Sequence, residues 1–349
     1  MKSSGIGGQA VMEGIMMRNG SEYSVAVRKE NGEIEVKKET YKGVGSKCKL
    51  FRLPFIRGIF SFVDSLVLGM KSLNYSASLF MEDGEEEEPG RFEKWLQKKF
   101  GDKAEKVIMD LTMVISIILA MGIFMVFPTW VSTLMKPLLG NGIWMALFEG
   151  VLRIAIFIAY VGLISLMPDI KRTYMYHGAE HKTIACYEAG EELTVENVRI
   201  QPKHHPRCGT SFLLITFILS IVFYSIVDVV VLMVSGYDLG AHYLLRVLSR
   251  VILLPVVAGI SYEALKGLAH SENKLCRILR APGMQLQRLT TAEPDDSMLE
   301  VAIVSMKAAL GDMPDGPLTP EGYVIAIPAP GKEEQPADAP APAQEEPQA

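Results

Sequence analysis

Four long apolar segments stand out in the hydrophobic pattern of the chain. They cover residues 108–131, 143–167, 212–235 and 245–268. Each approaches the ~20 predominantly apolar residues that a helix needs to cross a bilayer. The composition agrees, since 49% of the 349 residues are hydrophobic. The pattern therefore predicts a mainly α membrane protein with about four transmembrane helices, two within residues 107–167 and two within 212–268.

Basic residues flank these segments unevenly. Lys and Arg cluster before the first segment, between the second and third, and after the fourth, whereas the short connections 132–142 and 236–244 contain only Lys136. By the positive-inside rule, we expect a multi-pass protein of the cell inner (cytoplasmic) membrane, with both termini and residues 168–211 in the cytoplasm. The lipid bilayer is the predicted partner, and the charge pattern shows no basic footprint for nucleic acid.

A few charged residues lie inside the apolar segments. Glu149 and Arg153 have the i,i+4 spacing of a pair on one helix. Arg246 and Arg250 stand at the end of the fourth segment that the positive-inside rule places outside, and we expect them to pair with Asp228 or Glu149. A path for protons or ions through these residues is the alternative.

The N-terminal region, residues 1–50, has the pattern of a small β unit. The stretch YSVAVRKENGEIEVKKE alternates apolar and polar positions around Asn31-Gly32, which predicts a β-hairpin. Before it, GIGGQAVMEGIMMRNG is rich in glycine and contains Glu13. This acid is a further candidate for chemistry, with a structural turn as the alternative.

Residues 51–106 join this β unit to the first apolar segment. An amphipathic stretch carries Arg57, Asp64 and Lys71 on one helical face, seven residues apart. We expect an interfacial or packed helix, with a membrane span whose charges face other helices as the alternative. An acidic loop, EDGEEEEPG, and a basic juxtamembrane helix complete this region.

The region after the apolar segments, residues 269–327, contains the stretch DDSMLEVAIVSMKAAL, which predicts an amphipathic helix. Ser297 and Glu300 have the spacing of a capping box at its start. Residues 328–349 are rich in Pro, Ala and Glu, a composition typical of a disordered tail. We expect the N-terminal hairpin, the 168–211 loop and this C-terminal helix to form a small α+β cytoplasmic domain.

The stretch YHGAEHKTIACYE, within residues 168–211, has the strongest chemical pattern in the chain. His177 and His181 would share one face of a helix, so they could hold one metal ion together. The letters HGAEH fit H-x-x-E-H, in which two histidines bind zinc and the glutamate polarises the attacking water. Glu180 is then the candidate general base. Gly178 weakens the helix that this motif requires.

Further candidate ligands lie in HHPRCGTS, just before the third apolar segment. His205 and Cys208 could complete a site with the two motif histidines, because Zn²⁺ favours imidazole and thiolate ligands. A carboxylate ligand is the other option, from Glu188 or from Glu263 near the cytoplasmic end of the fourth segment. The expected cofactor is Zn²⁺ or another divalent metal. A structural zinc, or a set of hydrogen-bonded loop residues without metal, stays open.

Several of these stretches together resemble the YqhQ-like family of bacterial membrane proteins. The resemblance rests on GIGGQAVMEGIMMRNG, on YHGAEHKTIACYE followed by LTVENVR, on HPRCGTSF, and on LQRLTTAEPDDSMLEVAI. It covers nearly the whole chain except the acidic loop and the tail. It implies a polytopic membrane protein of bacterial type that has been labelled a predicted metal-dependent enzyme, and it brings no established substrate or catalytic residue.

The leading functional hypothesis is a metal-dependent hydrolase at the cytoplasmic membrane face. Its substrate could be a peptide, a lipid headgroup or a cell-envelope precursor, and the sequence leaves the substrate, any protein partner and the oligomeric state open. The alternative is a non-catalytic membrane scaffold or assembly factor. A transporter that uses Asp228, Arg250 and Glu263 is a third class, which is less favoured because paired Gly/Pro interruptions of the spans are not evident.

Overall fold

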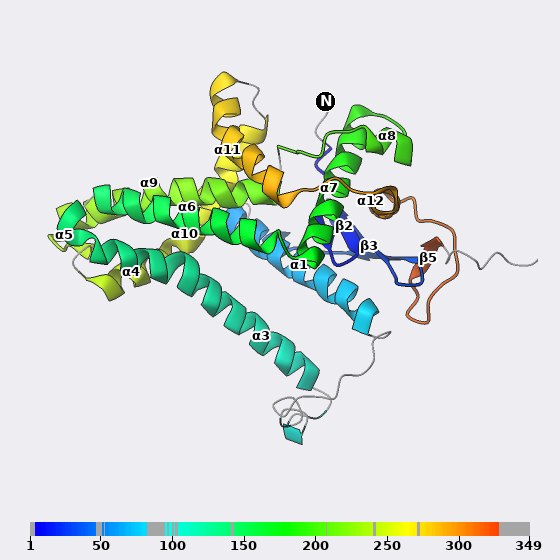
Figure 1. Cartoon of the computed structure of the whole chain (residues 1–349), viewed down its shortest axis with the longest axis horizontal. Coiled ribbons are helices and arrows are strands. Elements are labelled where there is room, and N and C mark those ends of the chain that lie inside the picture. The colour runs from blue at the N-terminus through cyan, green and yellow to red at the C-terminus, as the bar shows by residue number, and fades with distance from the viewer. Residues whose placement is uncertain are drawn as a thin grey trace, which may run out of the picture.

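The computed structural model describes residues 4–46, 51, 53–81, 95, 98–99, 101, 104–140, 143–206, 208–239, 242–270 and 273–327. The predicted acidic loop, most of the predicted basic juxtamembrane helix and the predicted disordered tail lie outside the described residues. Figure 1 shows long helices side by side at one end of the molecule and a sheet with shorter helices at the other.

The long helices confirm the four predicted spans. Candidate spans run over Leu111–Leu134, Trp144–Ile164, Gly209–Ser235 and Tyr243–Leu268, each apolar and long enough to cross a bilayer. Only 11% of the most apolar stretch of the first and third spans is buried within the protein. Most of their apolar surface therefore faces outward, as contact with lipid requires.

These spans correspond to a small set of helices. The first is built from α3 (Ala104–Met121), the π-helical turn η4 (Gly122–Val126) and α4 (Phe127–Leu134), and the short α5 (Lys136–Leu139) follows it. The others are α6 (Ile143–Ile164), α9 (Gly209–Ser235) and α10 (Tyr243–His270).

The sheet is an antiparallel meander in the order β1-β2-β3-β4-β5. Four strands come from the N-terminal region: β1 (Gly7–Val11), β2 (Gly14–Asn19), β3 (Glu22–Arg28) and β4 (Ile34–Thr40). The predicted hairpin is confirmed, because β3 and β4 pair across the turn that holds Asn31-Gly32. The last strand, β5 (Val324–Ile327), comes from the other end of the chain and pairs with β4.

Both faces of this sheet are covered by helices, which explains why β3 is buried along most of its length. Tyr23, Val25 and Val27 pack on Leu68 of α1 (Ile56–Met81). The intervening Ala26 points to the opposite face, into the core that includes α12 (Asp296–Leu310) and α7 (Pro168–Ala189). The α+β unit predicted from distant parts of the chain is thereby confirmed.

Helix α1 turns its charged face toward the protein. The Arg57 Nε donates to Glu263 on α10 at 2.6 Å, and the Asp64 carboxylate accepts from the Tyr41 hydroxyl and the Val44 amide. The packed helix predicted from the spacing of these charges is therefore observed. Its position at the membrane interface stays a prediction.

Two predictions about local structure were wrong. Residues 168–211 are mainly helical, because α7 and α8 (Val195–Arg199) occupy much of the predicted loop. The cap of α12 is Asp295, whose side chain accepts from the Met298 amide, so the predicted capping box at Ser297 lies two residues too late. Aspartate is a strong N-cap because its carboxylate accepts from a free amide of the first turn.

Glu13 lies in the turn between β1 and β2, with a positive φ of 47°. Its carboxylate accepts from Arg172 Nε at 2.6 Å and from the Tyr176 hydroxyl at 3.3 Å, and both partners are on α7. Glu13 therefore has a structural role, in which it fastens α7 to the sheet.

Candidate metal centre

Helix α7 positions the two motif histidines one turn apart. Pro168 occupies its first turn and Gly190, with a φ of 76°, ends it. The helix continues through Gly178 because this glycine meets a neighbouring segment. A Cβ there would collide with the carbonyl oxygen of Ala292, and the Ala292 amide donates to Tyr174 of α7 at 2.9 Å. Close backbone packing thus outweighs the low helix propensity of glycine.

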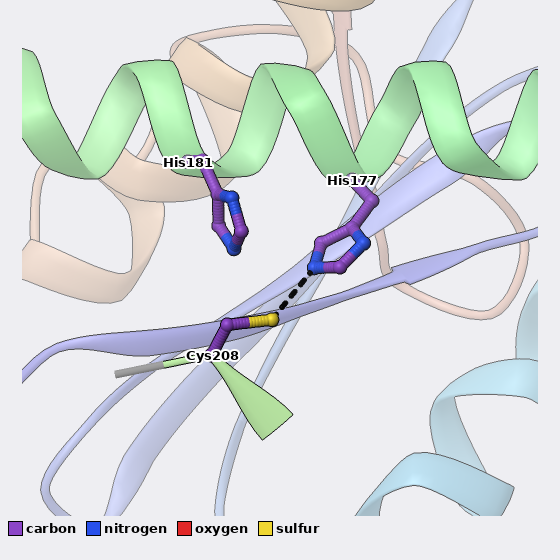
Figure 2. A group of neighbouring side chains, drawn as sticks. All are labelled: His177, His181 and Cys208. Carbon is purple, nitrogen blue, oxygen red and sulfur yellow. Dashed lines mark hydrogen bonds between the residues drawn. The ribbon is translucent and has the colours of Figure 1, made fainter. Parts of the chain in front are cut away.

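Three side chains converge at this helix (Figure 2). One possible ligand atom from each of His177, His181 and Cys208 lies within 4.8 Å of the others. The His177 Nε2 and the Cys208 Sγ are 3.2 Å apart. Cys208 immediately precedes the apolar helix α9, so the site joins the α+β unit to a membrane span.

Hydrogen bonds to backbone carbonyls fix the orientation of the two histidine rings. The Nδ1 of His177 lies 2.8 Å from the Thr290 carbonyl oxygen, and that of His181 lies 2.7 Å from the Lys203 carbonyl oxygen. A carbonyl can only accept, so Nδ1 carries the proton, and in the neutral form of each ring Nε2 has the lone pair that a metal would need. Backbone carbonyls that bind the outer nitrogen in this way are typical of histidines that ligate metals.

The donor set fits Zn²⁺ or a similar divalent ion. Zinc binds imidazole nitrogen at about 2.0–2.1 Å and thiolate sulfur at about 2.3 Å in tetrahedral geometry, which places such ligand atoms roughly 3.3–3.7 Å apart. The 3.2 Å separation between His177 and Cys208 is close to this spacing. Both His181 and Cys208 are buried, as is usual for a shaped metal site.

Glu180 lies beside the three possible ligands. One carboxylate oxygen is 4.0 Å from the His177 Nε2, and the side chain is 6% exposed. Burial raises the pKa of Glu180 to about 6, against the opposing effects of His177 and of the Gly8 backbone amide. A carboxyl with a pKa near neutrality can take up and release a proton at physiological pH.

Gly8 of β1 makes this position possible. A Cβ on Gly8 would lie 2.7 Å from the Glu180 Cγ and 2.9 Å from Oε1. Only a glycine lets the strand approach the carboxylate so closely, and its amide bonds to Glu180.

Two of the predicted ligands lie outside this group. The His205 ring packs beside His181, with 5.8 Å between centroids, and its Nε2 is 3.6 Å from Glu188. Glu188 in turn accepts from the Ser4 amide and hydroxyl at 2.7 Å. Glu263 is engaged with Arg57, as described above. The structure thus brings together His177, His181 and Cys208, with Glu180 adjacent.

Comparison with known proteins gives a family for the chain. A family model described as "Protein of unknown function (DUF1385)" matches residues 53–312. The chain belongs to the DUF1385 family. It is also 34% identical over 306 residues to a Bacillus subtilis (strain 168) protein described as "Uncharacterized protein YqhQ". The aligned region covers 87% of this chain and 92% of the relative. No solved structure matches the chain significantly.

This DUF1385 member also has the predicted ion pairs inside its spans. The Arg153 Nη2 donates to Glu149 at 2.9 Å, and Arg246 pairs with the same carboxylate at 2.6 Å. Arg250 pairs with Asp228 at 2.7 Å. The Arg246 pair links α10 to α6 and the Arg250 pair links α10 to α9, which is the geometry of structural contacts between helices.

Sequence reasoning missed the contribution of α11 (Lys274–Thr290) to the site. Its last residue supplies the carbonyl that binds His177. The Gln287 side chain accepts from the His205 amide at 2.9 Å and donates to the His205 carbonyl at 2.7 Å. The alternation of basic and apolar residues in KLCRILR indicates an amphipathic helix, but no sequence pattern identifies a backbone carbonyl as a partner.

Proposed function

We propose that this protein is a metal-dependent hydrolase embedded in the cell inner membrane, with its active site at the cytoplasmic face. The convergence of His177, His181 and Cys208, with both outer ring nitrogens fixed by carbonyls, carries the proposal. The placement of Glu180 next to this group supports catalysis. The family and the relative have no described activity, so the proposal rests on geometry.

The residues divide into two roles. His177, His181 and Cys208 would hold one divalent ion through two nitrogens and a sulfur, and three protein ligands are the number found in catalytic zinc sites. A bound ion would supply Lewis acidity to a substrate oxygen and to water. Glu180 would take a proton from the attacking water and return it to the leaving group, so that the elements of one water are added across the bond.

The position of Glu180 favours a catalytic metal site over a structural one. A structural zinc site is closed by four protein ligands, whereas a catalytic site keeps one position open. At 4.0 Å from the His177 Nε2, the Glu180 carboxylate is close enough to act through a water at an open position. A non-catalytic scaffold with a zinc staple would use the same histidines and cysteine but would not need an acid with a raised pKa.

Metal analysis of the purified protein tests the proposal. We expect the wild type to carry about one equivalent of metal, and the His177→Ala and Cys208→Ala variants to lose it. His242→Ala is the matched control, because His242 stacks on Tyr237 outside the site. A wild-type protein without stoichiometric metal, when purified without chelators, would refute the proposed hydrolase.

The Glu180→Gln variant then distinguishes a catalytic metal site from a structural one. If Glu180 is the general base, this variant keeps the metal and the melting temperature but fails to restore function in cells that lack the gene. If the metal only holds the fold together, Glu180→Gln complements as well as the wild type does.

A further inference from the structure

Helix α11 has two exposed faces of different character. Leu275, Ile278 and Leu279 are large apolar residues with exposed fractions of 61%, 67% and 50%. At 3.6 residues per turn, these three lie on one side of the helix, while the exposed Lys274 and Arg277 lie on another. An apolar face beside a basic one is the pattern of helices that lie in a membrane surface.

The second half of α11 is fixed against the membrane helices. Gly283, Leu286 and Gln287 are buried. A Cβ on Gly283 would lie 2.8 Å from the side chain of Ser211, the third residue of α9, so the two helices touch there. Helix α11 therefore crosses α9 at the end of the span nearest the metal centre, which is where the bilayer surface must lie.

The direction of α11 agrees with this position. Figure 1 shows α11, in yellow and orange, running across the direction of α6 and α9. Because α6 and α9 are long enough to cross the bilayer, a helix that runs across them at their ends lies parallel to the membrane surface.

We propose that α11 lies in the headgroup layer of the bilayer and binds anionic lipids there. Leu275, Ile278 and Leu279 would enter the boundary of the acyl chains, and Lys274 and Arg277 would contact lipid phosphates. The partner follows from charge complementarity, because basic residues next to a span attract anionic headgroups. The partner also follows from continuity, because α10 is a candidate membrane span that ends only a few residues before α11 begins.

Spin labels on neighbouring residues of α11 test its depth. Cys48 and Cys276 are replaced by Ser in the full chain, while Cys186 and Cys208 stay because both are buried. A nitroxide is attached at Ile278→Cys, and the protein is reconstituted into vesicles of phosphatidylglycerol and phosphatidylcholine.

Two positions serve as references, Arg277→Cys on the basic face of α11 and Lys307→Cys on the exposed side of α12. Collisions with oxygen, which concentrates among acyl chains, are compared with collisions with a water-soluble nickel chelate. We expect the oxygen-to-nickel ratio to be several-fold higher at residue 278 than at either reference. Equal ratios at residues 278 and 277 would overturn the proposal. So would dipolar broadening between labels at residue 278, which would mean that a second copy of the chain covers the apolar face.

A second measurement tests the anionic lipid itself. Spin-labelled phosphatidylglycerol and phosphatidylcholine report the lipid preference of the protein surface. The Lys274→Gln/Arg277→Gln variant should lose this preference several-fold, whereas Lys307→Gln should leave it unchanged. An unchanged preference in the double variant would refute the role of the basic face. Neither measurement depends on bound metal or hydrolysis, so each can fail while the proposed function stands.

Discussion

The adjacent glycines of β1 allow a controlled test of the role of Glu180. In Gly8→Ala, the new Cβ would lie 2.7 Å from the Glu180 Cγ and 2.9 Å from its Cδ. In Gly7→Ala, the new Cβ would meet nothing within 4 Å. The two substitutions have the same chemistry and differ by one residue in position. Only the first disturbs the carboxylate.

The size of the effect follows from these distances. Carbon atoms prefer to be about 3.5–4.0 Å apart, so Gly8→Ala must displace Glu180 or β1 by roughly 1 Å. Overpacking of this kind costs about 1–3 kcal/mol in the free energy of unfolding. A displacement of about 1 Å in a catalytic group can lower the rate by about 100-fold. We therefore expect a modest loss of stability and a large loss of function.

Three measurements on each variant check this reasoning: melting temperature, metal content and complementation in cells that lack the gene. Gly8→Ala should melt slightly below the wild type, keep its metal and fail to complement. Gly7→Ala should match the wild type in all three. If Gly8→Ala kept full function while its fold and metal were intact, the position of Glu180 would not matter and the catalytic assignment would be wrong.

Four further predictions concern the site and its support. Gly178→Ala should reduce folded yield and metal content together, because the new Cβ would collide with a backbone carbonyl that cannot move independently; yield and metal analysis check this. Cys208→Ser should weaken zinc binding at least tenfold in competition with a chromogenic chelator, because Zn²⁺ favours thiolate over hydroxyl. Glu149→Gln should cost about 3–5 kcal/mol in thermal unfolding in detergent, because it leaves buried arginines without their carboxylate. A hydrogen bond from Lys182 keeps the pKa of Glu293 below its usual range. The pair of Lys182 and Glu293 therefore stabilises the fold fully above the unfolded-state pKa of Glu293, and this contribution is lost as the pH falls through the folded-state pKa. Glu293→Gln should reduce the acid sensitivity of the melting temperature.

The sequence predicted those features that depend on one segment at a time. The four spans follow from apolar length alone, and the hairpin at Asn31-Gly32 follows from local turn chemistry. The pairing of His177 with His181 follows from helical spacing once α7 is a helix. The helical state of α7 was not predicted, because its polar composition and Gly178 are typical of a loop. The contact that stabilises the helix at Gly178 comes from Ala292, more than a hundred residues away.

Features that depend on which segments meet were less predictable. Glu263 stands near the end of its span, where an acid suggests a site, but the sequence does not show which neighbour it faces. In the fold that neighbour is Arg57, which pairs with it. The predicted pairing of Arg250 with Asp228 succeeded because few charges inside the spans can serve as partners, so the choice was narrow.

The burial of Glu180 is the strongest argument for a catalytic metal site over a structural one. The buried carboxyl lies 4.0 Å from His177, and the charge of His177 and the Gly8 amide both favour its ionised form, but burial outweighs them and raises its pKa. The raised pKa shows that burial disfavours the charged form of this carboxyl more than its two contacts favour it. A metal that only held α7 to α9 would need its ligands and would not need an acid beside them. A buried acid with a raised pKa beside a possible metal site is typical of groups whose function requires proton transfer.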